Sequence, residues 1–325
     1  MQKQKCSLEL YSNFLIINQN RYSGLELSKV SPVPDLHHDA VSRWLAASTF
    51  TPSQLWQQVK DLIELRSGYL VGDDTLLAKP YSRKNELARK QYSGNYHGLV
   101  NGMCLVNLLW TDGKSYVPID YRHYQKELDD RTKNDHFLDM LDKAKQRGLA
   151  PLYVLMDSWY GSVANLKHID LHGWKFICNL KSNRKVSIEK GTYVSISDLP
   201  LADKQIRQVW LKEYGSVLVS KLVAKDGSIT YMATNDLRLT EYESLTSHWQ
   251  NRWHIEEFHR GIKQTCGIES CYSTKASSQK THIFAAFIAF IKLEKCKIER
   301  QISWYEQKAQ FAREATKFHL ATAIA

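Results

Sequence analysis

The chain has 325 residues, of which 43% are hydrophobic and 24% charged, and these ordinary globular values exclude a disordered or membrane-embedded class. Lys and Arg outnumber Asp and Glu by 44 to 34, and the formal net charge of +10 favours a polyanionic partner such as nucleic acid. Six scattered cysteines without CxxC pairs, and no long apolar leader, predict reduced thiols and a cytoplasmic location.

Two helices are expected early in the chain, over residues 39–47 and 53–65. Thr51-Pro52-Ser53-Gln54 resembles a capping box with proline at the first helical position. The pair is interpreted as a helix-turn-helix that binds DNA or as a helical hairpin packed on the main domain, and the sequence leaves both open.

The next segment alternates strands and helices. Strands are predicted over 69–74, 99–110, 116–121, 152–156 and 174–180, and helices over 137–148 and 162–171. Asp112-Gly113 predicts the hairpin that joins the second and third strands. The order strand-strand-strand-helix-strand-helix-strand is that of the ribonuclease H-like fold, so we expect an α/β core.

Short strand-like segments between residues 186 and 236 predict a β-rich insertion, with a hairpin at Asp226-Gly227. A capping box at Thr240 then opens a helical stretch that runs to about Gln264, before Gly267. The apolar run 283–291 is too short to span a bilayer and predicts a buried helix, so no membrane partner is expected.

These patterns divide the chain into five parts. They are an N-terminal helical region (1–66) that possibly binds DNA ends, the first part of the core (67–185), the β-rich insertion (186–238), a helix that completes the core (239–270) and a C-terminal helical region (271–325). The basic stretch 292–317 in the last part is interpreted as an aid to DNA binding or to pairing of subunits.

Three carboxylates stand at informative places. Asp74 ends the first strand, Asp157 ends a buried strand, and Glu256 lies inside a helix. Oxygen ligands suit Mg²⁺, and two such ions about 3.5–4 Å apart support phosphodiester cleavage. Each carboxylate alone has an ordinary interpretation as a helix cap, a turn residue or a solvated side chain.

The helix around Glu256 strengthens the prediction of a metal site. Trp249, Arg252, Glu256 and Lys263 are separated by three, four and seven residues and therefore share one stripe of the helix. Such a stripe is either an ion-paired surface or a metal ligand placed between two phosphate-binding cations.

The segment 249–263 resembles the signature of bacterial insertion-sequence transposases of the DDE class, written Y-(2)-R-(3)-E-(6)-K. Arg252, Glu256 and Lys263 have this spacing, and Trp249 stands at the Tyr position. The resemblance covers about residues 68–270, because Asp73-Asp74-Thr75 and Met156-Asp157-Ser158 are similar to the two aspartate strands of the family. The family's aspartate directly precedes Thr, which favours Asp74 and leaves Asp73 as the alternative.

The resemblance implies an enzyme in which Asp74, Asp157 and Glu256 are catalytic and bind two Mg²⁺ ions, for which Mn²⁺ can substitute. Water attacks at the element end, and the freed 3′-OH is joined to target DNA, commonly after a hairpin intermediate. The implied partners are double-stranded terminal inverted repeats, target DNA and a second copy in a synaptic homodimer. Such a bacterial protein is nucleoid-associated when bound to DNA.

The residues expected to bind DNA fall in two places. Arg252 and Lys263 are expected to contact phosphates, and Trp249 or Trp253 to stack on a displaced base, although core packing would also explain the tryptophans. In the loop 79–90, Arg83 and Lys84 mix with an aromatic residue, a pattern typical of a DNA-contacting loop and also of a solvated one.

Two other functions fit part of the pattern. Another ribonuclease H-like nuclease would share the carboxylates but not the Arg-Glu-Lys spacing, and a non-catalytic DNA-binding protein derived from a transposase would not need all three carboxylates. A zinc hydrolase built on His254 and His259 is disfavoured because residues five apart on a helix diverge.

Overall fold

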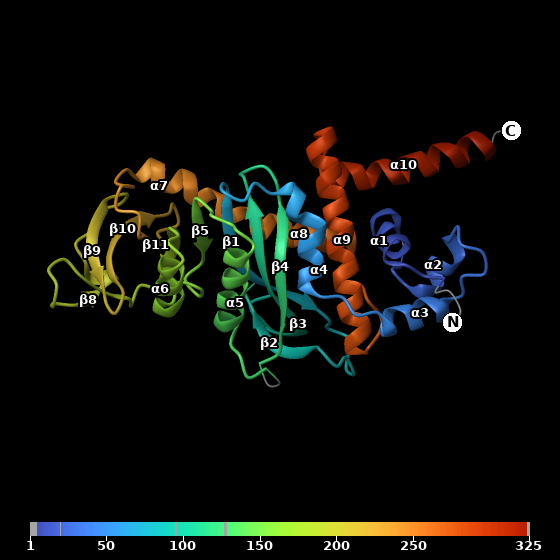
Figure 1. Cartoon of the computed structure of the whole chain (residues 1–325), viewed down its shortest axis with the longest axis horizontal. Coiled ribbons are helices and arrows are strands. Elements are labelled where there is room, and N and C mark those ends of the chain that lie inside the picture. Colours follow the sequence, from blue (N-terminus) through green and yellow to red (C-terminus); the bar gives the residue numbers. More distant parts are fainter. Residues whose placement is uncertain (1–4, 20, 95, 127–128, 324–325) are drawn as a thin grey trace.

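The computed structural model describes residues 5–19, 21–94, 96–126 and 129–323 (Figure 1). Its α-helices are α1 (Leu8–Ile17), α2 (Gly24–Val30), α3 (His38–Ala47), α4 (Pro52–Val59), α5 (Lys133–Gln146), α6 (Val163–Leu171), α7 (Tyr242–Trp249), α8 (Trp253–Cys266), α9 (Ala276–Arg300) and α10 (Trp304–Ala323). The short 3₁₀ segments are η1 (Lys60–Leu62), η2 (Ile196–Asp198) and η3 (Gln250–Arg252).

The strands join into one mixed sheet of eleven strands with the order β2-β3-β1-β5-β6-β11-β10-β9-β7-β8, and β4 also pairs with β3. They are β1 (Tyr69–Ala78), β2 (Arg89–Ser93), β3 (Gly98–Thr111), β4 (Val117–Tyr124), β5 (Tyr153–Met156), β6 (Phe176–Leu180), β7 (Lys185–Ser187), β8 (Val194–Ser195), β9 (Ile206–Leu211), β10 (Gly215–Val223) and β11 (Ile229–Thr234). Strands β1, β5 and β6 run parallel at the centre. The connections to β5 and β6 carry α5 and α6, as parallel pairing requires.

The β-type segments after residue 185 extend this central sheet. Strand β11 pairs antiparallel with β6, and β10, β9, β7 and β8 follow outward from it. Figure 1 shows them at the end of the molecule opposite to α1–α3 and α10. The expected strand-and-helix order of the core is confirmed, with β2 as an additional edge strand.

Helix α5 packs directly on the backbone of β1. The Phe137 ring of α5 is fully buried, and a Cβ atom built on Gly72 would lie 2.2 Å from its Cε2 atom. A side chain at residue 72 would therefore push α5 away from the sheet. This contact marks the face of β1 on which α5 and α6 lie.

We therefore predict that Gly72→Ala lowers the free energy of unfolding by about 1–3 kcal/mol, the usual cost of overpacking a core. Gly94→Ala serves as the control, because a Cβ atom at Gly94 would meet no atom within 4 Å. Urea denaturation of both variants measures the difference. Equal stability of the two variants would contradict the close packing of Phe137 on β1.

Helix α9 is the centre of the helical part. Residues 283–291 are all buried, so the predicted buried helix is confirmed. These residues form the middle of the longer helix α9. Helices α1, α3, α4 and α8 pack against α9. Because α3 and α4 are both anchored on α9, the structure favours packed helices over an independent helix-turn-helix.

Several local expectations need correction. Helices α1 and α2 were not predicted, and α1 is held by a long-range hydrogen bond from Tyr11 to His282 (2.9 Å). The capping box expected at Thr240 is absent, because α7 begins at Tyr242 and its N-cap Glu241 makes no side-chain bond. The helix expected to continue to Gln264 is interrupted by η3 before α8. None of the described helices is both long and apolar enough to cross a membrane.

Candidate active site

Two aspartates lie side by side where β1 and β5 meet. The parallel register pairs Gly72 with Met156, so the next residues along the two strands, Asp73 and Asp157, are neighbours. Laterally paired residues of a sheet point to the same face. The register therefore brings the carboxylates of Asp73 and Asp157 together.

Two asparagines extend this pair across the sheet. Asn107 of β3 is the cross-strand partner of Asp73, and Asn179 follows Cys178, the β6 partner of Met156. We call Asn107, Asp73, Asp157 and Asn179 the polar row. The Asn107 amide nitrogen lies 3.0 Å from Nε2 of His259 on α8, so the polar row faces α8.

Asp74 points to the opposite face, which corrects the expectation that it joins Asp157. Its carboxylate accepts hydrogen bonds from Lys133 Nζ (2.7 Å) and from the Tyr160 hydroxyl (2.9 Å). Lys133 is the first residue of α5, so Asp74 lies on the α5 face. The reason is the alternation of side chains along a strand, which puts consecutive residues on opposite faces.

The electrostatic surroundings of Asp73 are unfavourable for its charge. Burial raises the pKa of the Asp73 carboxyl well above its usual range, and the negative charges of Asp74 and Asp157 raise it further. The guanidinium of Arg252 opposes this shift. Among the described residues, its carboxylate accepts one hydrogen bond, from the backbone N–H of Asp74 (2.8 Å). The site therefore concentrates negative charge that a cation would neutralise.

Arg252 links the polar row to Glu256. Its Nη2 atom donates to Glu256 Oε1 at 2.6 Å, and its guanidinium lies 5.3 Å from the centre of the Trp249 ring. The predicted stripe of Trp249, Arg252 and Glu256 is thus formed across the junction of η3 and α8. Because Arg252 also acts on the charge of Asp73, Glu256 is presented to the face that carries Asp73 and Asp157.

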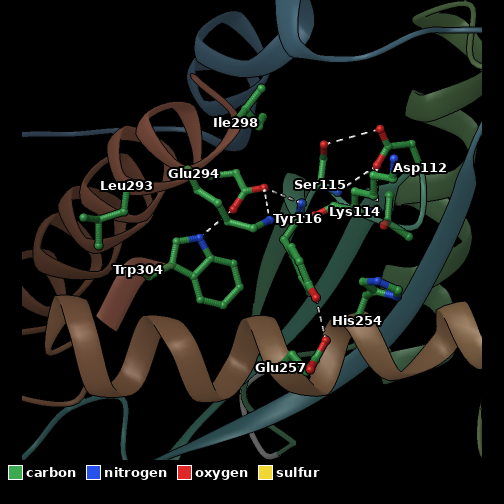
Figure 2. A network of polar contacts seen from close by, with 12 residues as sticks. Asp112, Lys114, Ser115, Tyr116, His254, Glu257, Leu293, Glu294, Ile298 and Trp304 are labelled. Carbon is green, nitrogen blue, oxygen red and sulfur yellow. Dashed lines mark hydrogen bonds and ion pairs between the residues drawn. The ribbon is translucent and has the colours of Figure 1, made fainter. Parts of the chain in front are cut away.

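Polar contacts tie α8 to the β3–β4 hairpin and, through it, to α9 and α10 (Figure 2). Glu257, the neighbour of Glu256, accepts a hydrogen bond from the Tyr116 hydroxyl at 2.6 Å. The buried Glu294 of α9 accepts from the Tyr116 backbone N–H (2.9 Å) and from the Trp304 indole N–H (2.6 Å). The β3–β4 hairpin, α9 and α10 are therefore tied to the helix that carries Glu256.

Lys263 fastens the other end of the helix to β1. Its Nζ atom donates to the Leu76 carbonyl at 2.7 Å and lies 3.3 Å from Glu269 Oε1. These two contacts already engage the Lys263 ammonium. The expected contact of Lys263 with a DNA phosphate stays a prediction. His259 is buried and its pKa is lowered by burial to about 3, so it is a neutral partner of Asn107.

Two exposed tryptophans lie close in the chain to Asp157 and Glu256. Trp253, at the start of α8, is 49% exposed, which leaves its ring free to stack, whereas Trp249 packs against the core. Trp159, two residues after Asp157, is 54% exposed, and Lys181 Nζ lies 5.3 Å from the centre of its ring. The sequence analysis missed Trp159, although its place two residues after Asp157 was a usable signal.

Arg83 and Lys84 are exposed in the loop that follows β1. The loop is anchored at its start by Lys79, whose Nζ atom donates to the backbone carbonyls of Glu269 (2.6 Å) and Cys271 (2.9 Å). Asn85 closes it by accepting two backbone N–H bonds through its side-chain oxygen. The loop thus presents two cations from a fixed backbone, and its end leads into β2.

The donor set around the polar row fits a hard divalent cation. Asp73, Asp157 and Glu256 supply carboxylate oxygens, which Mg²⁺ prefers. The buried amide oxygens of Asn107 and Asn179 have no hydrogen-bond partner among the described residues. Unsatisfied oxygens beside paired carboxylates are a place where a cation is stabilised. Among the described residues, the three carboxylates do not converge within 4.8 Å of one another.

Comparisons with known proteins bear on the family and the fold of the chain. The sequence model of the family described as "Transposase DDE domain" matches residues 70–291. A solved structure described as the piggyBac transposase synaptic complex with hairpin DNA is similar in fold, with a TM-score of 0.55 and 10% identity, over 94% of this chain and 68% of that chain. No curated protein matches at the level of sequence.

Two complexes of Mos1 transposase align less well. The paired-end complex with the left transposon end has a TM-score of 0.21 and 12% identity, over 54% of this chain and 59% of that chain. The strand transfer complex has a TM-score of 0.21 and 13% identity, over 54% of this chain and 58% of that chain.

Proposed function

Because the chain belongs to the family of transposase DDE domains, which are metal-dependent enzymes of DNA cleavage and strand transfer, we propose that Asp73, Asp157 and Glu256 are its catalytic carboxylates. The observation that carries this assignment is the β1–β5 register, which sets Asp73 beside Asp157 on the face covered by α8. Asp73 takes the role for which the sequence favoured Asp74.

The three carboxylates would hold two Mg²⁺ ions, for which Mn²⁺ can substitute. Bound there, the ions supply activation of the attacking oxygen and neutralisation of the leaving oxygen. The protein holds the three carboxylates in position through the sheet register and through the contacts of Glu257 and Lys263 that fix α8. The high pKa of Asp73 is the expected cost of holding these charges together without the ions.

Double-stranded DNA is the proposed substrate, as terminal inverted repeats and as target. Arg252, stacked near Trp249 and paired with Glu256, is positioned to receive the phosphate next to the scissile bond. The exposed rings of Trp253 and Trp159 can stack on bases displaced from the end. Arg83 and Lys84 would extend the phosphate contacts along the duplex.

We further propose a hairpin intermediate at the element end and a homodimer that joins two ends. The piggyBac complex described above holds hairpin DNA, which supports this route by analogy. The pairing of two ends needs two active sites, and a dimer meets that need.

The test of the proposed function is strand transfer. The full-length chain is incubated with Mg²⁺, a labelled DNA end taken from the flank of its gene, and a circular target plasmid. We expect label to appear in nicked or linearised plasmid only when both the end sequence and a divalent ion are present. Binding of the end without any joined or cleaved product would favour a DNA-binding protein that lacks catalysis.

We predict that Arg252→Ala weakens binding to element ends and reduces the slope of log K against log salt by about 1, because one phosphate contact is lost. Arg260→Ala is the matched control. It lies on the same helix but lines a pocket with Tyr116 and Trp304, away from the polar row. Salt titrations of end binding measure the slopes, and an unchanged slope for Arg252→Ala would return that residue to a structural role.

A further inference from the structure

A second cluster of metal-ligating side chains lies on the α5 and α6 side of the sheet. Asp142 belongs to α5, His168 belongs to α6, and His172 caps the C-terminal end of α6. Their ligand atoms all lie within 4.8 Å of one another, and no other group of this kind occurs in the described parts of the chain. The polar row faces α8 instead, so the two sites are separate.

The two imidazoles converge on a single carboxylate oxygen. His168 Nε2 lies 2.6 Å and His172 Nε2 lies 2.9 Å from Asp142 Oδ1. The two ring centres are 4.7 Å apart and the rings are nearly perpendicular. All three donor atoms therefore point into one small volume between the two helices.

The spacing in the sequence explains this convergence. His168 and His172 are four residues apart, and His172 keeps helical backbone angles (φ −75°, ψ −4°) although it follows the last residue of α6. Residues at this spacing lie on one side of a helix, the arrangement by which two histidines bind zinc in helical metal sites. Asp142 supplies the third ligand from the neighbouring helix.

The surroundings allow an ion to enter and to bind. The side chains of His168 and Asp142 are 23% and 42% exposed, so the site opens to solvent. The ammonium of Lys145 donates a hydrogen bond to the His172 carbonyl at 2.7 Å.

We propose that Asp142, His168 and His172 form a binding site for Zn²⁺ or a transition-metal dication of the same class. Two imidazoles and one carboxylate are a donor set that suits Zn²⁺, Ni²⁺ or Cu²⁺, whereas Mg²⁺ prefers oxygen ligands only. Three protein ligands leave at least one position for water. The chemistry of this site therefore differs from that of the catalytic carboxylates.

An ion at this place would join the two helices that support the active site from behind. Helix α5 begins with Lys133, which binds Asp74, and helix α6 follows Asp157 and is capped by Ser162. Cross-linking the distal ends of these helices would stabilise the parts of the sheet next to Asp73 in β1 and Asp157 after β5. The alternative is that Asp142 only hydrogen-bonds to both histidines and that no ion binds.

Zinc titration of the full-length chain decides between the two accounts. The titration uses a chromophoric zinc chelator as competitor, in millimolar Mg²⁺ so that the catalytic carboxylates are occupied. We expect one equivalent of Zn²⁺ per chain, with an affinity lowered at least about tenfold by His168→Ala and by His172→Ala. His38→Ala is the matched control, because His38 forms an exposed pair with Asp39 (2.9 Å) but belongs to no group of three metal-ligating side chains in the described structure.

Zinc K-edge absorption of the wild-type protein gives a second readout that needs no variant. Two imidazole ligands in the first coordination shell would support the site. Absence of stoichiometric binding, a spectrum without two imidazoles, or equal affinity in wild type and His168→Ala would each overturn the proposal. Because none of these readouts depends on DNA cleavage, failure of the zinc site and failure of the proposed catalytic function are distinguishable.

Discussion

Replacement of Asp73 by Asn is expected to reduce DNA cleavage by roughly three orders of magnitude or more, because a metal ligand contributes several kcal/mol to the transition state. The same variant is expected to be more stable than the wild type when no divalent ion is present. The reason is that Asp73 is buried among like charges and its pKa is raised. Cleavage gels and thermal melts in a chelator measure the two effects.

The sign of the stability change follows from linkage. The pKa of Asp73 is higher in the folded state than the ordinary value of about 3.9 in the unfolded chain, so the folded state binds the proton more tightly. Stability is therefore lost as pH rises above the unfolded value, and the charged form destabilises the metal-free protein at neutral pH. Asn carries no charge, so its advantage over Asp should vanish at low pH.

Asp74→Asn provides the contrast. Its carboxylate pairs with Lys133 and accepts a bond from Tyr160, so the substitution is expected to lower stability by about 1–3 kcal/mol. We expect the folded fraction to keep cleaving DNA. Loss of cleavage in Asp74→Asn together with retained cleavage in Asp73→Asn would reverse the assignment of the first catalytic aspartate.

Replacement of Glu256 by Gln is expected to abolish cleavage while end binding stays largely intact. The variant removes a charged oxygen ligand but preserves the shape of the side chain on α8. Arg252 would lose its carboxylate partner at 2.6 Å and remain available for phosphate. Gel shift and cleavage assays on the same DNA end separate the two effects.

Glu257→Gln is the matched control for this prediction. Glu257 is the next residue on α8, and its carboxylate bonds to the Tyr116 hydroxyl, on the side shown in Figure 2. An amide oxygen can still accept that bond, so we expect this variant to cleave. Retained cleavage in Glu256→Gln would remove Glu256 from the site, and equal loss in both variants would point to disturbed placement of α8.

The sequence was sufficient for the elements with strong local patterns. The apolar run before Asp157 predicted β5, which is buried at all four residues, and the spacing of Arg252 and Glu256 predicted their contact. Both depend on periodicity within one element, which local sequence records directly. The order of strands and helices along the chain in the core followed in the same way from alternating strand and helix patterns.

The choice between Asp73 and Asp74 could not be made from local pattern. Residues 69–72 are buried on both faces of β1, so no alternation of polar and apolar residues shows which aspartate faces which layer. Which of the two aspartates faces α8 is decided by tertiary contacts, namely Phe137 against Gly72 and Asn107 against His259. Helix α1 was missed for a similar reason, because its Tyr11 bonds to His282 more than 270 residues away.

The most direct test of the account is Mg²⁺-dependent cleavage of the DNA that flanks this gene, with wild type and Asp157→Asn compared on a denaturing gel. Asp157 is proposed as catalytic whether the first catalytic aspartate is Asp73 or Asp74. Its neighbour in the β1–β5 register is Asp73. We predict end-specific nicks or hairpins with wild type and none with Asp157→Asn. Equal cleavage by both proteins, or end binding by wild type with no cleavage in Mg²⁺ or Mn²⁺, would contradict the account.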